Sequence, residues 1–320
     1  MKRFIVLFVA AALLIGLRGA WAAEIKIGII QYVEHLALDS ARQGFLAALA
    51  DSGLEPGKNI TVDYQNAQGD AANLSTIGDR FLAKQVDLIL AIATPAAQSV
   101  AAKTGTIPIL GTAVTDYVSA RLVFSNENPG TNVSGTSDLN PIEEQISLLK
   151  QLVPHAQTVG LLYTSSEDNS VLQAGMAKRA IAERGLKYYE ITITNSNEVQ
   201  QAVQSLVQKV DAIYVPTDNV VSASMPIVYG AAVQAQVPVI CGEGNQVLNG
   251  GLATLGINYE KLGYQTGLMA VRVLRGEDVA AMPIETAGDF EYLINGTVAA
   301  ELGILIPDGL LEYVTEIEME

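Results

Sequence analysis

Two stretches of the sequence decide the fold, because each combines a buried strand with the start of a helix. The first covers residues 86–95 (VDLILAIATP), and the second covers residues 210–218 (VDAIYVPTD). A short apolar run rich in β-branched residues is typical of a strand inside a parallel sheet. The Thr, Pro and Asp residues that follow are common at helix starts, where backbone N–H groups lack partners. Ligands bind at this carboxyl edge of open parallel sheets, so both stretches predict binding loops.

The similarity between the two halves of the chain extends beyond these stretches. Residues 28–32 (GIIQY) resemble residues 160–164 (GLLYT), and residues 107–111 (IPILG) resemble residues 237–242 (VPVICG). The second copies lie 132 and 130 residues after the first, and the two deciding stretches are 124 residues apart. A repeat of this length indicates two homologous domains rather than a solenoid of short units.

Strands and helices alternate in both halves, which predicts an α/β fold with two Rossmann-like parallel-sheet lobes. The C-terminal residues do not read as a third domain, so we expect them to return the chain across both lobes. Crossings near residues 133–137, 255–258 and 284–288 would form a three-segment hinge that lets the lobes close on a ligand. The predicted boundaries are 24–135 plus 257–285 for lobe 1 and 136–256 plus 286–320 for lobe 2.

The first 23 residues are typical of a secretory signal peptide. Residues 1–3 (MKR) are basic, residues 4–17 are almost entirely apolar, and Ala20 and Ala22 are the small residues that a signal peptidase reads. We therefore expect a periplasmic protein that is cleaved near Ala22 or Ala23. No later stretch reaches the roughly 18 apolar residues of a membrane span. An uncleaved N-terminal anchor is the alternative.

Composition limits the possible functions. The chain has 320 residues and a net charge of −15, which becomes −18 when Lys2, Arg3 and Arg18 leave with the signal peptide. Such an acidic chain lacks the basic face that nucleic-acid binding requires. The single cysteine, Cys241, cannot form an intramolecular disulfide, and it follows an apolar run, so we interpret it as a buried structural residue.

Motifs for catalysis and cofactor binding are missing. The two histidines, His35 and His155, lie in different halves and belong to no zinc-binding pattern. The sequence contains no P-loop, no dinucleotide-binding glycine pattern after its first strand, and no nucleophile elbow. We therefore predict that the protein is not an enzyme and has no catalytic residues, metal site or cofactor. A secreted enzyme is the alternative, and turnover of a bound ligand would reveal it.

The predicted loops carry polar and aromatic groups that suit a small ligand. The turn at Thr94 offers a hydroxyl and free backbone N–H groups at a helix start, which suits a carboxylate. Asp218 or Glu243 from the second half suits an ammonium group, with Asp116 as the next choice. Together these groups fit a zwitterion with an apolar side chain.

Other residues of the same loops would complete the site. Tyrosines could enclose the apolar side chain of the ligand, and small residues after Thr94 would allow a close approach. The predicted ligand-binding residues are Gln31, Tyr32, His35, Thr94, Pro95, Ala96, Ala97, Thr115, Asp116, Tyr117, Thr217, Asp218, Glu243, Asn258 and Tyr259.

Each of these residues also has a simpler structural interpretation. Thr94 and Thr217 could be helix caps, Asp116 could cap a turn, and His35 could be a cap or a surface residue. A single loop tyrosine is more often a packing residue than part of a binding site. The functional interpretation therefore depends on all of these groups meeting at one edge of both lobes.

Several segments in combination resemble one family, the ABC transporter substrate-binding proteins, and within it the tryptophan/tyrosine-binding-like branch with the type I periplasmic binding fold. The resemblance covers nearly all of the mature chain. In this branch a Gly-Ile-Asp-Tyr pattern is usual, whereas Asn258 replaces the Asp here. The segments are 28–35 (GIIQYVEH), 93–98 (ATPAAQ), 112–116 (TAVTD), 133–138 (VSGTSD), 215–219 (VPTDN) and 256–263 (GINYEKLG).

The resemblance implies a periplasmic receptor that delivers its ligand to a membrane permease and an ATPase. We expect the protein to be a monomer. It also implies an aromatic or other apolar L-amino acid as the ligand. Glu243 is similar in placement to the ammonium-binding acid of branched-chain amino-acid receptors. A sensor partner for a membrane receptor, or a nucleoside or sugar as the ligand, are the alternatives. A transcriptional regulator with this core would instead begin with a helix-turn-helix.

Overall fold

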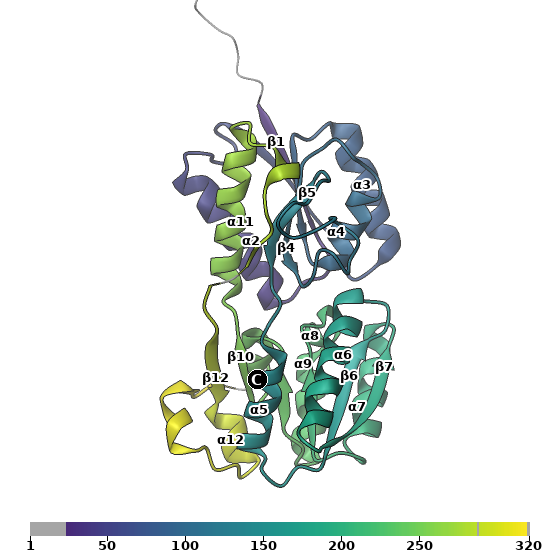
Figure 1. Ribbon diagram of the computed structural model, residues 1–320, viewed down its shortest axis with the longest axis vertical. Coiled ribbons are helices and arrows are strands. Elements are labelled where there is room, and N and C mark those ends of the chain that lie inside the picture. Colours follow the sequence, from purple (N-terminus) through teal and green to yellow (C-terminus); the bar gives the residue numbers. More distant parts are fainter. Residues whose placement is uncertain (1–23, 287, 319–320) are drawn as a thin grey trace, which may run out of the picture.

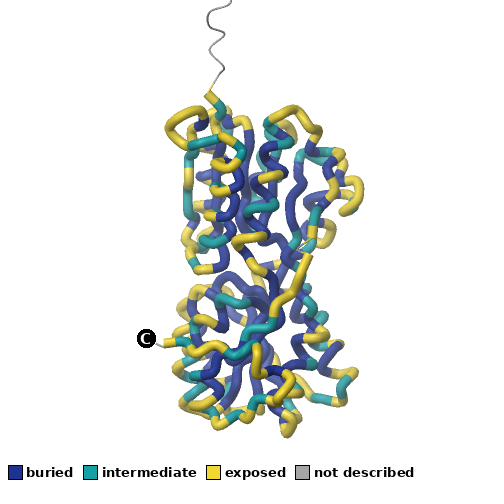
Figure 2. Tube along the Cα trace, turned by 90° about the vertical axis from the view of Figure 1, so that its left-hand side faces the viewer, coloured by how far each residue is buried: buried dark blue, intermediate teal, exposed yellow. Residues whose placement is uncertain are grey.

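The computed structural model describes residues 24–286 and 288–318, which form two lobes stacked along the long axis (Figure 1). The predicted signal peptide and its cleavage site lie outside the described residues. Within the described ranges, no helix is long and apolar enough to cross a membrane. Each lobe has its own β-sheet with helices on both sides, and the buried residues concentrate inside each lobe (Figure 2).

The sheet of lobe 1 contains strands from the first half of the chain and one short late strand. Its order is β11-β5-β4-β3-β1-β2, and all its neighbouring pairs are parallel. The central strands are apolar because helices cover both faces, as expected for a parallel sheet. The strands are β1 (Ile25–Gln31), β2 (Ile60–Asn66), β3 (Leu88–Ile92), β4 (Ile109–Val114), β5 (Val133–Ser137) and β11 (Glu285–Thr286).

The sheet of lobe 2 repeats this arrangement and extends it at one edge. Its order is β13-β12-β10-β9-β8-β6-β7, and β12 pairs with β10 in the antiparallel direction. The C-terminal segment thus completes this sheet. The strands are β6 (Thr158–Thr164), β7 (Lys187–Ile193), β8 (Ala212–Val215), β9 (Val239–Cys241), β10 (Ala253–Gly256), β12 (Glu291–Asn295) and β13 (Val314–Thr315).

The five main strands of the two lobes have the same spatial order. Numbered along each half, both sheets read 2-1-3-4-5, which is a doubly wound order with its switch point between the first and third strands. The prediction of two related α/β lobes is therefore confirmed. The deciding stretches supply β3 and β8, the third strand of each half.

Helices cover both sheets at the positions that the apolar periodicity predicts. In lobe 1 they are α2 (Leu36–Asp51), α3 (Ala71–Lys84), α4 (Thr94–Ala101) and α11 (Tyr259–Leu274). In lobe 2 they are α5 (Ile142–Leu152), α6 (Asp168–Glu183), α7 (Val199–Leu206), α8 (Asn219–Ser222), α9 (Met225–Gln234), α10 (Gly244–Leu248) and α12 (Gly296–Glu301). Short 3₁₀ turns occupy Ser196–Glu198, Val279–Ala281 and Asp308–Tyr313.

Two details of lobe 2 follow from its local sequence. The chain after Asp218 forms two helices, α8 and α9, because Pro226 cannot occupy a helix interior and instead stands in the first turn of α9. The residues after β9 lead into α10, whose first turn Glu243 caps. Both details lie next to the site described below.

The chain passes between the lobes three times, as predicted: after β5, after β10 and between β11 and β12. The second crossing leads into α11, which returns the chain to lobe 1 and packs along α2 (Figure 1). Glycines make this close packing possible, since a Cβ at Gly263 would collide with the carbonyl of Ala41. The start of α11 is thereby held firmly at the boundary between the lobes.

Candidate ligand-binding site

A small cavity lies between the two lobes, at the carboxyl ends of their central strands. Its free volume is about 10 Å³, far below the roughly 300–1,000 Å³ of typical small-molecule sites. The side chains of the two lobes therefore nearly fill the cleft in this arrangement of the lobes. The lining residues are His35, Leu38, Ala113, Asp138 and Tyr259 from the lobe 1 side and Asn169, Thr217, Asp218, Asn219, Ser222 and Glu243 from lobe 2.

The parallel topology explains why these residues meet. The loops after β1 and β5 provide His35 and Asp138, and the end of β4 itself provides Ala113. The loops after β8 and β9 provide Asp218 and Glu243. Ligands of doubly wound folds bind at this edge, near the switch point. Here the two edges face each other across the hinge, so each lobe contributes one wall.

Two neighbouring acids of lobe 2 are fully buried. Asp218 caps α8 and accepts hydrogen bonds from the backbone N–H of Val221 at 2.8 Å, and from the N–H and hydroxyl of Thr164 at 2.5 and 2.8 Å. Glu167 accepts from Asn169 Nδ2 at 3.2 Å and from the amide of Asn219. Burial raises the pKa of both carboxyl groups, and the charge of Asp218 raises that of Glu167 further.

Two further acids lie at the hinge side of the cavity. Glu243 caps α10, and its carboxylate accepts the N–H groups of Asn245 at 2.5 Å and Gln246 at 2.9 Å. Burial raises the pKa of Glu243 to about 7, and the charge of Asp138 contributes to that rise. Asp138 accepts from the hydroxyl of Tyr259 at 2.7 Å, and burial raises its pKa as well. Among the described residues, none of these acids forms an ion pair.

Apart from Asp138, the lining residues of lobe 1 are neutral. His35 Nε2 lies 3.3 Å from Asn219 Oδ1, across the cleft, so this nitrogen is the donor. Its other nitrogen, Nδ1, is buried and has no partner within the described chain. Burial lowers the pKa of His35 to about 4, so the imidazole is neutral at pH 7. Tyr32 is also buried beside the cleft, and the charges of Glu167 and Asp218 add to the burial that raises its pKa.

Direct hydrogen bonds join the lobes at the cleft. On the rim, Gln98 Nε2 donates to Asp168 Oδ2 at 2.8 Å. Deeper in the cleft, Gln173 Nε2 donates to Thr115 Oγ1 at 3.2 Å and also to the hydroxyl of Thr217. These contacts hold the lobes close together around the cavity.

The start of α4 stands behind the lobe 1 wall. Ala93 has φ +84 and donates its N–H to the carbonyl of Thr112 at 3.0 Å, next to the lining residue Ala113. Thr94 is 2% exposed, and its hydroxyl has no hydrogen-bond partner in the described part of the chain. A buried hydroxyl without a partner is unfavourable. Pro95, Ala96 and Ala97 form the rest of this first helical turn and do not line the cavity.

Several predicted site residues lie elsewhere. Tyr117 is fully buried in lobe 1, where its hydroxyl donates to the carbonyl of Thr136 at 3.0 Å, and it covers glycines that have no side chain of their own. Asp116 accepts the N–H of Ser119 at 2.6 Å, as a turn cap does. Gln31 is buried away from the cavity and donates to Asp39 at 3.0 Å. Tyr117 and Asp116 border a separate hollow beside the first crossing.

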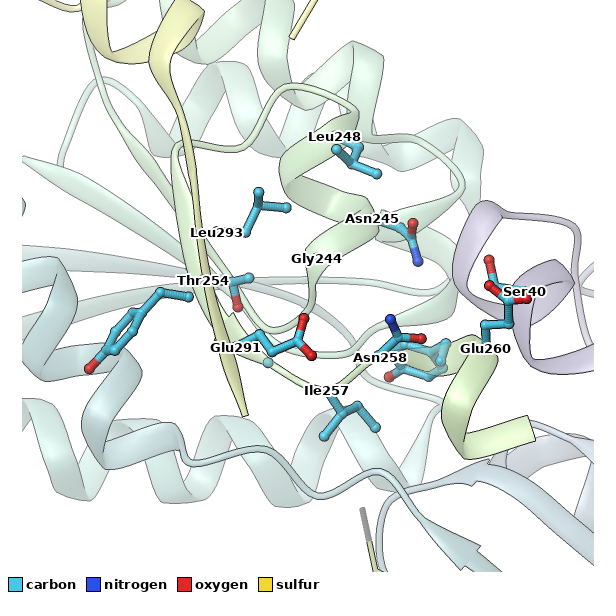
Figure 3. A pocket seen from close by; sticks show the side chains of 13 residues that line it. Ser40, Gly244, Asn245, Leu248, Thr254, Ile257, Asn258, Glu260, Glu291 and Leu293 are labelled. Carbon is cyan, nitrogen blue, oxygen red and sulfur yellow. The ribbon is translucent and has the colours of Figure 1, made fainter. Parts of the chain in front are cut away.

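Asn258 belongs to a different, larger groove on the flank of the hinge. This groove has a volume of about 260 Å³ and runs from Ser40 of α2 to Leu248 and Leu293 of lobe 2 (Figure 3). The side chain of Asn258 caps α11 through the N–H of Lys261 at 3.1 Å. Tyr259 separates the groove from the inner cavity, since it lines both. The groove holds no buried acid, so we assign the ligand site to the inner cavity.

The sequence prediction missed the residues that complete the inner site. Asp138, Glu167, Asn169 and Gln173 are all at least nine-tenths buried at the cleft. A signal existed for Asp138, which follows the polar strand β5 at a predicted crossing. Glu167 and Asn169 lie a few residues after the end of β6, and nothing in the sequence marks them as buried.

Comparisons with known proteins agree with this architecture. Residues 26–318 match the family described as ABC transporter substrate binding protein. The chain is 46% identical to a tyrosine-binding protein of Clostridioides difficile (strain R20291), over 84% of this chain and 78% of that protein. At 14% identity, a myo-inositol-bound ABC transporter solute-binding protein from Bacillus halodurans has a TM-score of 0.62, which shows the type I periplasmic binding fold alone.

Two related solved structures differ in how well their overall structure superimposes on this chain. A Streptococcus pneumonia ABC domain in complex with L-Trp is 36% identical and has a TM-score of 0.89 over 92% of this chain and 100% of that chain. A ligand-free, open substrate-binding protein from Clostridium difficile is 47% identical over the same shares, yet its TM-score is 0.70. The lobes of this chain are therefore arranged more like those of the L-Trp complex. By its sequence match and its fold, the chain belongs to the ABC transporter substrate-binding protein family.

Proposed function

We propose that this protein is the extracytoplasmic solute-binding component of an ABC importer and binds an aromatic L-amino acid between its lobes. The observation that carries the proposal is the inner cavity between the lobes, which is walled by buried acids without a cationic partner among the described residues. Buried carboxylates are stable when a positive group pairs with them. An ammonium group on the ligand supplies that charge.

The start of α4 is the proposed site for the ligand carboxylate. Thr94 has a buried hydroxyl that no described group satisfies, and the first N–H groups of an α-helix lack partners inside the helix. The positive end of the helix dipole favours an anion there. With acids on lobe 2 and donors on lobe 1, a zwitterion would engage both lobes at once, which makes closure depend on the ligand.

The relatives support the ligand class. One related protein is named for tyrosine binding, and another was crystallised with L-Trp. Tyr259 lies 4% exposed at the cavity, and Leu38 adds an apolar surface. The partners that follow from this function are a membrane permease and its ATPase, and export through the predicted signal peptide would bring the protein to them.

We also propose lobe boundaries that follow the two sheets. Ser137 and Thr286 pair within the sheet of lobe 1, and the backbone N–H of Asp138 still donates to Val114 of β4. The first boundary is therefore drawn after residue 138 rather than 135, and the third after residue 286. The second boundary stays between Gly256, the last residue of β10, and Ile257.

A ligand screen tests this function directly. Binding raises the melting temperature by linkage, by roughly 2.7 kcal/mol of stability at a ligand concentration of 100 Kd. We expect L-Trp, L-Tyr or L-Phe to give the largest shift, branched-chain amino acids a smaller one, and the D-enantiomers little. Sugars and nucleosides are included as other solute classes. A clear sugar or nucleoside shift without an amino-acid shift would contradict the proposal.

A further inference from the structure

The acids at the cavity differ in how many hydrogen bonds they already accept. A carboxylate has about four acceptor positions on its two oxygens. Asp218 uses them within lobe 2, on Thr164, Val221 and the hydroxyl of Ser170. It therefore lines the cavity but has little capacity left for a ligand.

Asp138 has the opposite balance. It is 3% exposed and lines the cavity, and each oxygen accepts one side-chain hydrogen bond, from Thr115 Oγ1 at 2.9 Å and from Tyr259 Oη at 2.7 Å. Its own backbone N–H is a third donor. Both side-chain donors are neutral hydroxyls, and no ion pair reaches the group within the described residues. This buried acid therefore keeps an unused acceptor position.

The position of Asp138 is fixed on the lobe 1 side of the cleft. Its backbone N–H donates to the carbonyl of Val114 at 3.2 Å, directly after β5. Glu243 lies close enough on the lobe 2 side for the charge of Asp138 to act on it. The two acids thus approach one region of the cavity from the two lobes, where each repels the other unless a cation lies between them.

An unsatisfied acceptor elsewhere in the same cavity also points to a ligand that donates hydrogen bonds. Asn169 is 5% exposed and lines the cavity. Its Nδ2 donates to Glu167 and to the carbonyl of Thr217, while its Oδ1 has no partner in the described chain. Asn169 stands one helical turn before Gln173, which itself contacts Thr115, the partner of Asp138.

We propose that Asp138 is the ligand-binding residue that receives the ammonium group, with Glu243 as the second acid, and that Asp218 is structural. This inference rests on the proposed amino-acid binding. An ammonium group brings three donors and one positive charge, which satisfies the unused acceptors and separates the two carboxylates. Because Asp138 and Glu243 belong to different lobes, the ammonium group itself would help to hold the cleft closed.

Calorimetry with two ligands that differ only in the amine tests this assignment. The pair is L-Trp and indole-3-propionate, or L-Tyr and 3-(4-hydroxyphenyl)propionate if L-Tyr binds better. We expect Asp138→Asn to lose at least about thirtyfold in affinity for the amino acid, the size typical of an unpaired buried charge. Affinity for the amine-free acid should be unchanged or higher, so the preference for the amine collapses.

Control variants separate charge recognition from hinge structure. Thr115→Val and Tyr259→Phe each remove one hydroxyl that holds Asp138 but keep its charge, so they should affect both ligands of a pair equally. Asp218→Asn should keep the preference for the amine. If Asp138→Asn does not fold, a structure of the wild-type complex decides, because the ammonium nitrogen must lie within hydrogen-bond distance of the Asp138 carboxylate.

Each outcome has one meaning. If the wild-type protein binds no amino acid, the proposed function and this assignment both fail. If it binds amino acids but Asp138→Asn keeps the preference for the amine, only the assignment to Asp138 is wrong. If Asp218→Asn removes that preference, the ammonium site belongs to Asp218 instead.

Discussion

The strand ends of the two lobes can be compared position by position, because both sheets have the same order. After β3, lobe 1 has Ala93 and Thr94, and after β8, lobe 2 has Pro216 and Thr217. At this edge of lobe 1, the backbone of Ala93 has a positive φ of +84. The hydroxyl of Thr94 has no hydrogen-bond partner among the described residues. Lobe 2 presents buried acids in a dense network of hydrogen bonds.

This difference shows how the two lobes of a duplicated fold come to form chemically different walls of one cleft. The backbone path is shared, so the same loops meet at the cleft. The side chains have diverged in charge: acids concentrate on lobe 2, and its partner lobe contributes neutral groups and Asp138 at the crossing. An asymmetric cleft of this kind suits a ligand whose two ends differ in charge.

The largest expected effect distinguishes an acid of lobe 2 from an acid of lobe 1. Asp218→Ala leaves the N–H and hydroxyl of Thr164 and the N–H of Val221 without their acceptor in the interior. At about 1–3 kcal/mol for an unsatisfied buried group, the free energy of unfolding should fall by about 4 kcal/mol. Urea denaturation measures the change.

The matched control is Asp116→Ala in lobe 1. Asp116 accepts one N–H, that of Ser119, in a turn at the surface, so its loss should cost less than about 1 kcal/mol. Equal costs for the two variants would mean that Asp218 is not the structural acid that its hydrogen bonds indicate.

The comparison also shows what the sequence could predict. The repeat, the alternation of strands and helices and the crossings depend on local apolar patterns, and the sequence predicted them. The role of Tyr117 was not, because only the folded sheet shows that its ring fills the space over Gly111 and Gly135. From the sequence, a tyrosine in a loop at a sheet edge looks the same whether it points into the cleft or back into the core.

The acids illustrate a second limit. Asp218 was predicted near the ligand, and it does line the cavity, but its hydrogen-bond partners from β6 are 54 residues away in the chain. Such partners decide whether a carboxylate is available to a ligand, and they depend on side-chain directions that a sequence does not contain. For the same reason, the sequence alone did not predict that Glu167 and Asn169 are buried at the cleft.

The next effect is a pH dependence that belongs to lobe 2. The raised pKa of Glu243, about 7, means that between about pH 4.5 and 7 the folded protein binds more protons than the unfolded chain. Stability from this group is therefore present below that window and falls as the pH rises through it. Glu243→Gln should be about as stable as wild type at pH 5 and more stable by about 1–3 kcal/mol at pH 8.

His35 on lobe 1 gives the opposite dependence of stability on pH, so it serves as the comparison for Glu243. Its pKa is lowered to about 4, so between about pH 4 and 6.5 the unfolded chain binds more protons and stability rises with pH. Thermal unfolding of wild type, Glu243→Gln and His35→Gln from pH 4 to 8 separates the two groups. A constant difference between wild type and Glu243→Gln at every pH would contradict the assignment to Glu243.

A smaller effect concerns binding by lobe 1. Thr94→Val removes a buried hydroxyl that has no partner among the described residues, so the ligand-free protein should be unchanged or slightly more stable. If Thr94 holds the ligand carboxylate, affinity should fall by about 1–2 kcal/mol, or roughly five- to thirtyfold. The backbone donors of α4 remain, which limits the loss.

Thr94→Ser keeps the hydroxyl and removes only the methyl group, so it is the control for a change in side-chain shape. Calorimetry with the amino acid found in the screen should give near wild-type affinity for Thr94→Ser. If Thr94→Val binds as tightly as wild type, the carboxylate is held elsewhere, and lobe 1 contributes shape rather than charge recognition.

The smallest effect tests the strained backbone of lobe 1. Ala93 has φ +84 and ψ 152, a region that is open almost only to glycine and that costs other residues of order 1–3 kcal/mol. Ala93→Gly relieves this strain but adds about 0.5–1 kcal/mol of entropy to the unfolded state, so we expect a net gain of about 1 kcal/mol. Lobe 2 has Pro216 at the equivalent position, and proline cannot adopt positive φ.

Calorimetric melting measures the gain, expected as a rise of about 2–4 °C. Ala97→Gly is the matched control, because it puts the same residue four positions later inside α4, where it should cost about 1 kcal/mol. A fall in stability for Ala93→Gly would mean that the turn carries no strain. A rise in stability together with weaker ligand binding would mean that the strained backbone of lobe 1 is kept because it points the start of α4 at the cleft. Lobe 2 instead presents acidic side chains to the cleft from an unstrained backbone.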